Sequence, residues 1–278
     1  MTDAVVSGPE IHRTLRPRAW LVGLAGGVIA ALLGWAGLID DNLLVGGLVV
    51  VQLGLVASLL NVLGAPGRRG GMVIGAAAAI AADVVLAHRE LRPAGGLMGV
   101  LALALIASVL HQLIRRPRRF VAASLAAEMS AVALVLCLAC VRGLTSEAVG
   151  RAGLLTWTFT LAVSLPVGRF VDQKVSWLPL GPESQRGIFG LIAGIGSAVV
   201  VGGLVGNAHA ELGVSNGELL AGVTALAAYV ADATTVRAAA DLQLKDRKRV
   251  ASLRPLAVLL PVAMAAPVAY IVGRVLLG

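Results

Sequence analysis

The chain has 278 residues, of which 58% are hydrophobic and 14% charged, and its formal net charge at pH 7 is +8. A mean hydropathy of +0.89 excludes an ordinary soluble domain. The positive charge does not require a nucleic acid as partner, because the basic loops of a membrane protein face anionic lipid headgroups.

Nine long apolar segments follow one another along the chain. Each is close to the roughly 20 residues that a helix needs to cross the hydrocarbon core of a bilayer, although the third and sixth are short. Backbone polar groups in lipid must be hydrogen-bonded internally, so all nine are predicted to be helices. In chain order the predicted spans are Trp20–Leu38, Leu43–Leu63, Gly71–Ala87, Leu97–Ile114, Phe120–Val141, Gly153–Val167, Ile188–Val205, Glu218–Asp232 and Leu256–Leu277. The sequence therefore predicts an all-α, polytopic helix bundle, with a basic segment at 1–19 and two halves at 20–150 and 151–278.

Basic residues are distributed unevenly between the loops that join these spans. One side of the membrane would carry 18 of the 23, among them Arg169 and Lys174 after the sixth span, and the other side only Arg89, Arg92, Arg142, Arg151 and Arg274. Cytoplasmic loops carry the excess of Lys and Arg. The asymmetry predicts a cytoplasmic N-terminus and an external C-terminus. Because arginine greatly outnumbers lysine, with abundant alanine, glycine and valine, we expect a multi-pass protein of the bacterial inner membrane.

Three carboxylates lie inside the spans or at their ends. Charge at this depth is costly, so such residues usually face the bundle interior and mark a function. Asp83, near the outer end of the third span, could instead reach the interface. Glu128 could pair with His111 or with the basic cluster Arg115–Arg119, or it could line a polar cavity. Asp232, at the inner end of the eighth span, is the strongest functional candidate.

Small residues and prolines give further indications about helix packing. Glycines at close-packing spacing on the seventh span predict a tight helix–helix contact; they are Gly190, Gly194, Gly202, Gly203 and Gly206. Pro166, Pro261 and Pro267 are expected to kink their helices or to open backbone carbonyls to a cavity.

A polar segment after the eighth span carries the pattern D-x8-D-L-x-x-K-D, formed by Asp232, Asp241, Lys245 and Asp246. It resembles the C-terminal signature of the CDP-diacylglycerol synthases, which are phosphatidate cytidylyltransferases. Lys174-Val-Ser176-Trp177 looks like that family's K-K-S/T-W motif before the seventh span, and the segment from Leu259 resembles its closing helix. The family also has about nine spans and a cytoplasmic active site.

This resemblance implies transfer of CMP from CTP to a lipid phosphate, with Mg²⁺ as cofactor. Mg²⁺ is usually held by one or two carboxylates and by substrate phosphates. The implied metal ligands are Asp232, Asp241 and Asp246; the implied catalytic residues are Asp241, Lys245 and Asp246; and the implied substrate contacts are Lys174, Ser176 and Arg237. Asp232 and Asp241 are nine residues apart, on opposite sides of an unbroken helix, so a shared metal site requires a break between them.

Two other functions remain open. The segment Arg247–Pro255 lacks the His- and Gly-rich motif of the family, and Thr156–Val167 lacks its carboxylate. These departures favour an inactive relative that serves as a scaffold for another membrane protein or forms a homodimer. The regular spacing of Arg237, Asp241 and Lys245 also fits an ion-paired, solvated helix face. The third possibility is an unrelated transporter of a small molecule or lipid, whose path would pass Asp83 and Glu128.

Overall fold

A computed structural model of the chain describes residues 19–87, 93–116, 120–146, 150–175, 187–241 and 247–277. These residues form nine helices, each long and apolar enough to cross a membrane. They are α2 (Ala19–Ile39), α3 (Asp41–Leu63), α4 (Arg68–Ala87), α5 (Pro93–Ile114), α6 (Val121–Ser146), α7 (Gly150–Lys174), α8 (Ile188–Ala208), α9 (Val214–Asp241) and α10 (Arg247–Leu277). The predicted class is confirmed: the chain is an integral membrane helix bundle in contact with lipid.

The two spans that the sequence predicts to be short are full length in the structure. α4 has 20 residues and α7 has 25. Hydropathy falls at the end of α7 because Arg169 and Asp172 are charged, yet the helix continues through both. These two residues, which the sequence placed in a loop, are buried inside the bundle.

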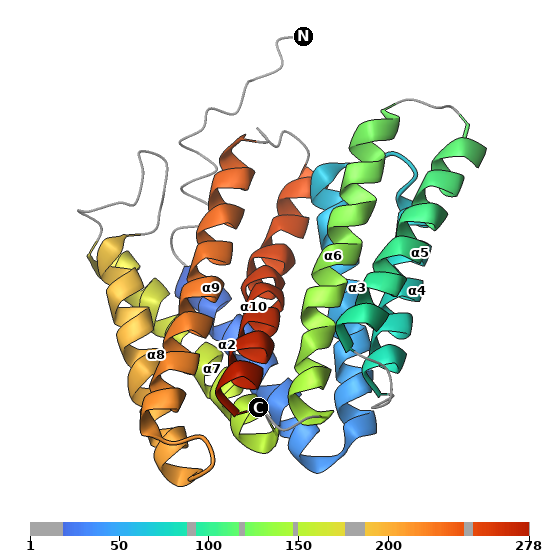
Figure 1. Cartoon of the computed structure of the whole chain (residues 1–278). Helices are drawn as coiled ribbons and strands as arrows, with labels where there is room; N and C mark the ends of the chain where they lie inside the picture. Colours follow the sequence, from blue (N-terminus) through green and yellow to red (C-terminus); the bar gives the residue numbers. More distant parts are fainter. Residues whose placement is uncertain are drawn as a thin grey trace.

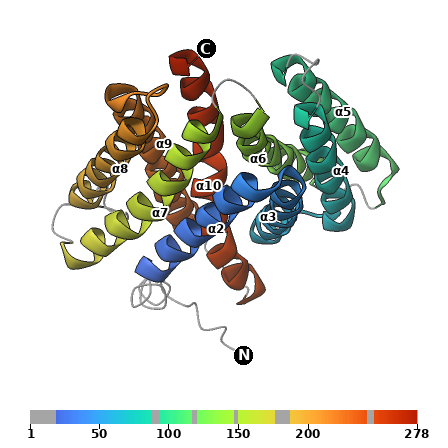
Figure 2. The same ribbon diagram turned by 90° about the horizontal axis from the view of Figure 1, so that it is seen from below.

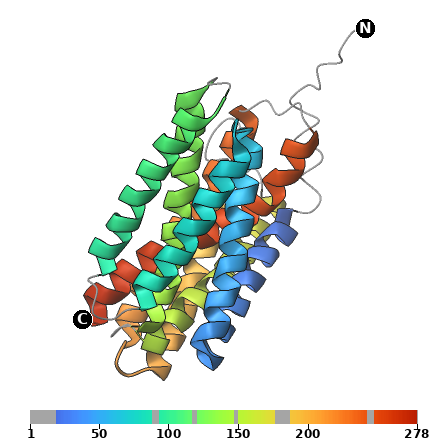
Figure 3. The same ribbon diagram turned by 90° about the vertical axis from the view of Figure 1, so that its right-hand side faces the viewer.

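Consecutive helices run in opposite directions, so that alternate connections meet at the same end of the bundle (Figures 1 and 3). The last turns of α3, α5 and α9 and the first turns of α4, α6 and α10 gather at one end. This is the end that the charge asymmetry predicts to be cytoplasmic. Large apolar side chains on the outside, such as Val50 (70% exposed) and Trp35 (59% exposed), suit a surface covered by lipid.

The helices form two groups with α10 between them (Figure 2). One group contains α3, α4, α5 and α6, and the other contains α2, α7, α8 and α9. α10 contacts members of both, including α3, α6 and α9. The main apolar core therefore continues from one group to the other, with Leu48, Val141, Trp157 and Val262 among its fully buried members.

The predicted glycine face of α8 is confirmed as a close contact. Every fourth residue from Gly190 to Gly206 is small and buried, with Ala198 in the middle. A Cβ atom on Gly194 would lie 3.2 Å from the Ser164 carbonyl of α7, and one on Gly202 would collide with the backbone of α9 at Gly217. The small residues thus allow α8 to approach both α7 and α9.

Candidate functional site

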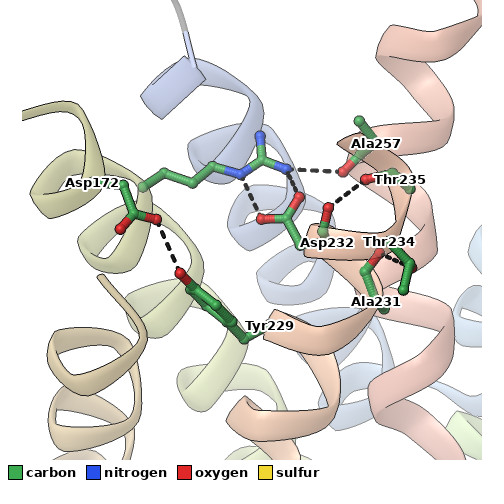
Figure 4. Close-up of polar contacts among 8 residues, drawn as sticks. Asp172, Tyr229, Ala231, Asp232, Thr234, Thr235 and Ala257 are labelled. Carbon is green, nitrogen blue, oxygen red and sulfur yellow. Dashed lines mark hydrogen bonds and ion pairs between the residues drawn. The ribbon is translucent and has the colours of Figure 1, made fainter. Parts of the chain in front are cut away.

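Four polar residues on α7 and α9 form a buried cluster near the predicted cytoplasmic end. Arg169 and Asp172 are three residues apart on α7, and Tyr229 and Asp232 are three residues apart on α9, so each pair shares a helix face. Arg169 contacts Asp232, and Tyr229 contacts Asp172 (Figure 4). The two helices are therefore joined by two polar contacts one turn apart.

The Arg169–Asp232 contact is a bidentate ion pair. Arg169 donates from Nε to Asp232 Oδ2 at 3.0 Å, and from Nη2 to Asp232 Oδ1. The two side chains are 6% and 1% exposed. Paired guanidinium–carboxylate bonds of this kind are strong and directional, and both oxygens of Asp232 accept them.

A proline on α10 supplies a third acceptor for the same arginine. Pro261 has no backbone N–H, so the Ala257 carbonyl four residues earlier has no intrahelical donor. Arg169 Nη2 donates to this carbonyl at 3.1 Å (Figure 4). The carbonyl freed by Pro261 therefore accepts from a guanidinium and does not open to a cavity as the sequence suggested, and Arg169 joins α7 to both α9 and α10.

Asp172 and Tyr229 form hydrogen bonds with the backbone of Gly187, the residue immediately before α8. The Gly187 amide, immediately before α8, donates to Asp172 Oδ1 at 2.9 Å. The Tyr229 hydroxyl lies 2.7 Å from the Gly187 carbonyl and 3.2 Å from Asp172 Oδ2, and it shares its single hydrogen between these acceptors. The cluster therefore fixes the relative positions of α7, α8, α9 and α10.

The Arg169 pair bears on the metal role that the resemblance implies for Asp232. Both of its oxygens accept hydrogen bonds from Arg169. Among the described residues, no group of three or more His, Cys, Asp and Glu residues could hold a metal ion. α9 also continues without a break from Asp232 to Asp241. Asp232 thus has a guanidinium partner within the described residues, and its role as a Mg²⁺ ligand stays a prediction.

The other predicted site residues are described only in part. Lys174 ends α7, and its Nζ lies 5.8 Å from the centre of the Phe170 ring. The side chains of Arg237 and Asp241 lie outside the described part of the structure, and so do Ser176, Lys245 and Asp246. The roles assigned to these five residues stay predictions.

Glu128 lies in a second buried polar cluster, between α5, α6 and the α3–α4 turn. Its Oε1 is 3.1 Å from His111 Nδ1 and accepts a hydrogen bond from Gln112 Nε2 at 2.7 Å. Ser124 Oγ donates to the Pro66 carbonyl at 2.6 Å and accepts from Gln112 Nε2 at 2.9 Å. Of the alternatives left open for Glu128, the structure shows the pairing with His111, and the cluster connects two helices to a turn.

Asp83 is buried between α3 and α4, where Gln52 Nε2 donates to its Oδ1 at 3.4 Å. Its side chain is therefore inside the bundle and not at the interface. The other oxygens of this pair, Asp83 Oδ2 and Gln52 Oε1, have no hydrogen-bond partner in the described part of the chain.

The sequence did not identify Arg169 and Asp172 as site residues. A usable signal was present: an acid–base pair three residues apart directly follows the sixth span, and Tyr229 and Asp232 repeat this spacing at the end of the eighth. Two polar pairs at equal helical spacing can cross-link two adjacent helices.

No protein-family model matches the chain, and no curated protein matches it. The fold and the buried clusters define the class: a polytopic integral membrane protein whose helices are held together by polar contacts inside the bundle.

Proposed function

We propose that this chain is a non-catalytic relative of the CDP-diacylglycerol synthases that acts as a membrane scaffold or as the partner of another membrane protein. The observation that supports this proposal is the bidentate Arg169–Asp232 pair. Asp232, one of the three carboxylates that the resemblance assigns to the metal, is already paired with an arginine.

Recruiting Asp232 to a metal would be costly. The ion would have to share the two Asp232 oxygens with the Arg169 guanidinium, which repels a cation, or displace that group, which is 6% exposed. An arginine left buried without its partner costs several kcal/mol, on the order of the 3–5 kcal/mol seen when buried pairs are broken. A structural role for the pair requires no such rearrangement. The missing His- and Gly-rich motif in Arg247–Pro255 supports the same proposal.

A second candidate is the active enzyme, which would transfer CMP from CTP to a lipid phosphate. The observation that favours it is the position of the buried cluster toward the predicted cytoplasmic end of α9, whose last residue, Asp241, shortly precedes Lys245 and Asp246 in the sequence. In that case Arg169 and Asp232 would position α9, and the metal would depend on Asp241 and Asp246.

The two candidates are separated by nucleotide binding and by CMP transfer. Purified protein in detergent, shown to be folded by a cooperative melt, is heated with CTP and Mg²⁺, and ATP serves as the nucleotide control. Radiolabelled CTP and phosphatidic acid are then supplied, with an active cytidylyltransferase in the same detergent as positive control.

The scaffold proposal expects no CTP-specific stabilisation and no labelled lipid. Labelled CDP-lipid that disappears in Asp246→Asn, while the melting temperature stays unchanged, would overturn the scaffold proposal and establish the enzyme. Selective stabilisation by CTP and Mg²⁺ would also contradict it.

A further inference from the structure

A cavity of about 500 Å³ opens between the α3–α4 turn and the first turns of α10. Three arginines line it: Arg68 and Arg69 at the start of α4, and Arg249 near the start of α10. Its described lining contains no Asp or Glu. The cavity lies at the predicted cytoplasmic end, separate from the Arg169–Asp232 cluster.

Local geometry holds two of these arginines in place. Gly64 ends α3 with a φ of +61°, a left-handed conformation that glycine adopts without strain. A Cβ atom at this position would collide with the Arg249 guanidinium, so the absence of a side chain gives Arg249 its room over the turn. Arg68 Nη1 donates to Asn61 Oδ1 on α3.

The α3–α4 turn, which forms one wall of the cavity, packs against the Glu128 cluster on α5 and α6. Ser124 Oγ on α6 donates to the Pro66 carbonyl in the turn. Cβ atoms on Gly67 and Gly70 would collide with the side chains of Arg115 and His111, so the turn packs directly on α5. The backbone that carries Arg68 and Arg69 is therefore anchored to two other helices.

All charged side chains in the described lining of the cavity are cationic. Arg69 and Arg249 form no ion pair with the described residues, and the partner of Arg68 is a neutral amide. Arginine forks match phosphate oxygens and form charge-assisted hydrogen bonds to them. Three positive charges suit a phosphate monoester, which carries about −1.5 to −2 at pH 7, better than a diester with a single charge. The positive end of the α4 dipole adds to the same attraction.

We propose that Arg68, Arg69 and Arg249 form a binding site for a phosphate monoester. The buried Leu60 lines the same cavity, which lies where the apolar spans end. An acyl chain could therefore extend along the bundle from a bound headgroup, as basic pockets between membrane helices allow. The same chemistry would accept a soluble phosphate monoester. This site is independent of the proposed function, since it uses none of the residues of the α7–α9 cluster.

The test is a titration of the full-length protein in detergent with short-chain phosphatidic acid, followed by the melting temperature. Short-chain phosphatidylglycerol is the diester control, and glycerol 3-phosphate is the soluble monoester. We expect phosphatidic acid to stabilise the wild type selectively and its affinity to fall about tenfold or more in Arg249→Gln, because charge-assisted bonds are lost. Arg254→Gln is the matched control, since Arg254 is an exposed arginine on the same helix that does not line the cavity.

Stabilisation by phosphatidic acid alone would assign the site to a lipid headgroup, and equal stabilisation by glycerol 3-phosphate would assign it to a soluble monoester. Both results support the proposal if Arg249→Gln removes the effect and Arg254→Gln does not. Equal responses to phosphatidylglycerol and phosphatidic acid, or equal losses in both variants, would overturn it, because general charge attraction would then explain the binding. If Arg249→Gln does not fold, Arg69→Gln on the exposed start of α4 gives the same comparison.

Discussion

The Arg169–Asp232 pair offers the most direct test of what holds this bundle together. We expect Arg169→Met to lower the free energy of unfolding by about 3–5 kcal/mol, since removal of one partner of a buried pair leaves the other charge uncompensated. Asp232 is 1% exposed, so its carboxylate has little solvation to offset the loss of the guanidinium. The substitution also leaves the Ala257 carbonyl without a donor, because Pro261 has no N–H to offer.

A double variant distinguishes the interaction between Arg169 and Asp232 from the separate contributions of the two side chains. In Arg169→Met/Asp232→Leu both charges are replaced by apolar groups, and such replacements of buried pairs are often neutral or stabilising. We therefore expect the double variant to be more stable than Arg169→Met by about 2 kcal/mol or more, which is a strong coupling in a double-mutant cycle. Arg151→Met is the matched control: Arg151 is an exposed arginine on the same helix, and its removal should change stability by less than about 0.5 kcal/mol.

The assay is unfolding of the purified variants in mixed micelles at increasing denaturing detergent, followed by circular dichroism and by tryptophan fluorescence. Trp157 on α7 is fully buried and is well placed to report loss of the core. Losses that simply add in the double variant, or an Arg169→Met protein as stable as the wild type, would refute the conclusion that each of the two buried charges depends on the other.

Three further predictions concern helix packing, the Glu128 cluster and the orientation of the chain in the membrane. Gly202→Ala should destabilise the protein by about 1–3 kcal/mol through overpacking against α9, whereas Gly196→Ala, on the same helix with no neighbour within 4 Å, should not; the thermal melts of the two variants make the comparison. Glu128→Leu should cost about 1–3 kcal/mol because it removes the acceptor of buried donors, and equal melting temperatures for variant and wild type would contradict this. For the orientation, a cysteine introduced at Thr2 should react with a membrane-impermeant maleimide only in broken cells, and one at Gly278 should react in intact cells; the reverse pattern would invert the predicted topology.

Most of the fold could be predicted from the sequence because hydropathy determines both the number and the type of the elements. A span in lipid needs a minimum length and internal hydrogen bonding, so nine apolar segments imply nine helices. The packing face of α8 was also predictable, since small residues recur there every four positions. The ends of the helices were less predictable: α9 begins at Val214 and reaches Asp241, well beyond the predicted span.

The buried clusters could be predicted only in part, because a hydropathy scale assigns every charged residue to a solvent-exposed segment. Asp232 and Glu128 were identified because each is an isolated acid in apolar sequence. Arg169 was missed because it comes after the apolar stretch of α7, where a loop is the simpler expectation. Its partner is 63 residues away along the chain, and no local pattern specifies that pairing.

The distribution of charge among the described residues supports the proposed phosphate site. Of the buried carboxylates, Asp232 is bound by Arg169, and Glu128 accepts hydrogen bonds inside the bundle. Asp83 is enclosed with Gln52. The cavity beside the α3–α4 turn, in contrast, has three arginines and no acid among its described lining residues. Because carboxylates hold metal ions whereas guanidinium groups bind anions, the described part of the molecule is better equipped to recognise a phosphate at its surface than to hold a divalent cation in its interior.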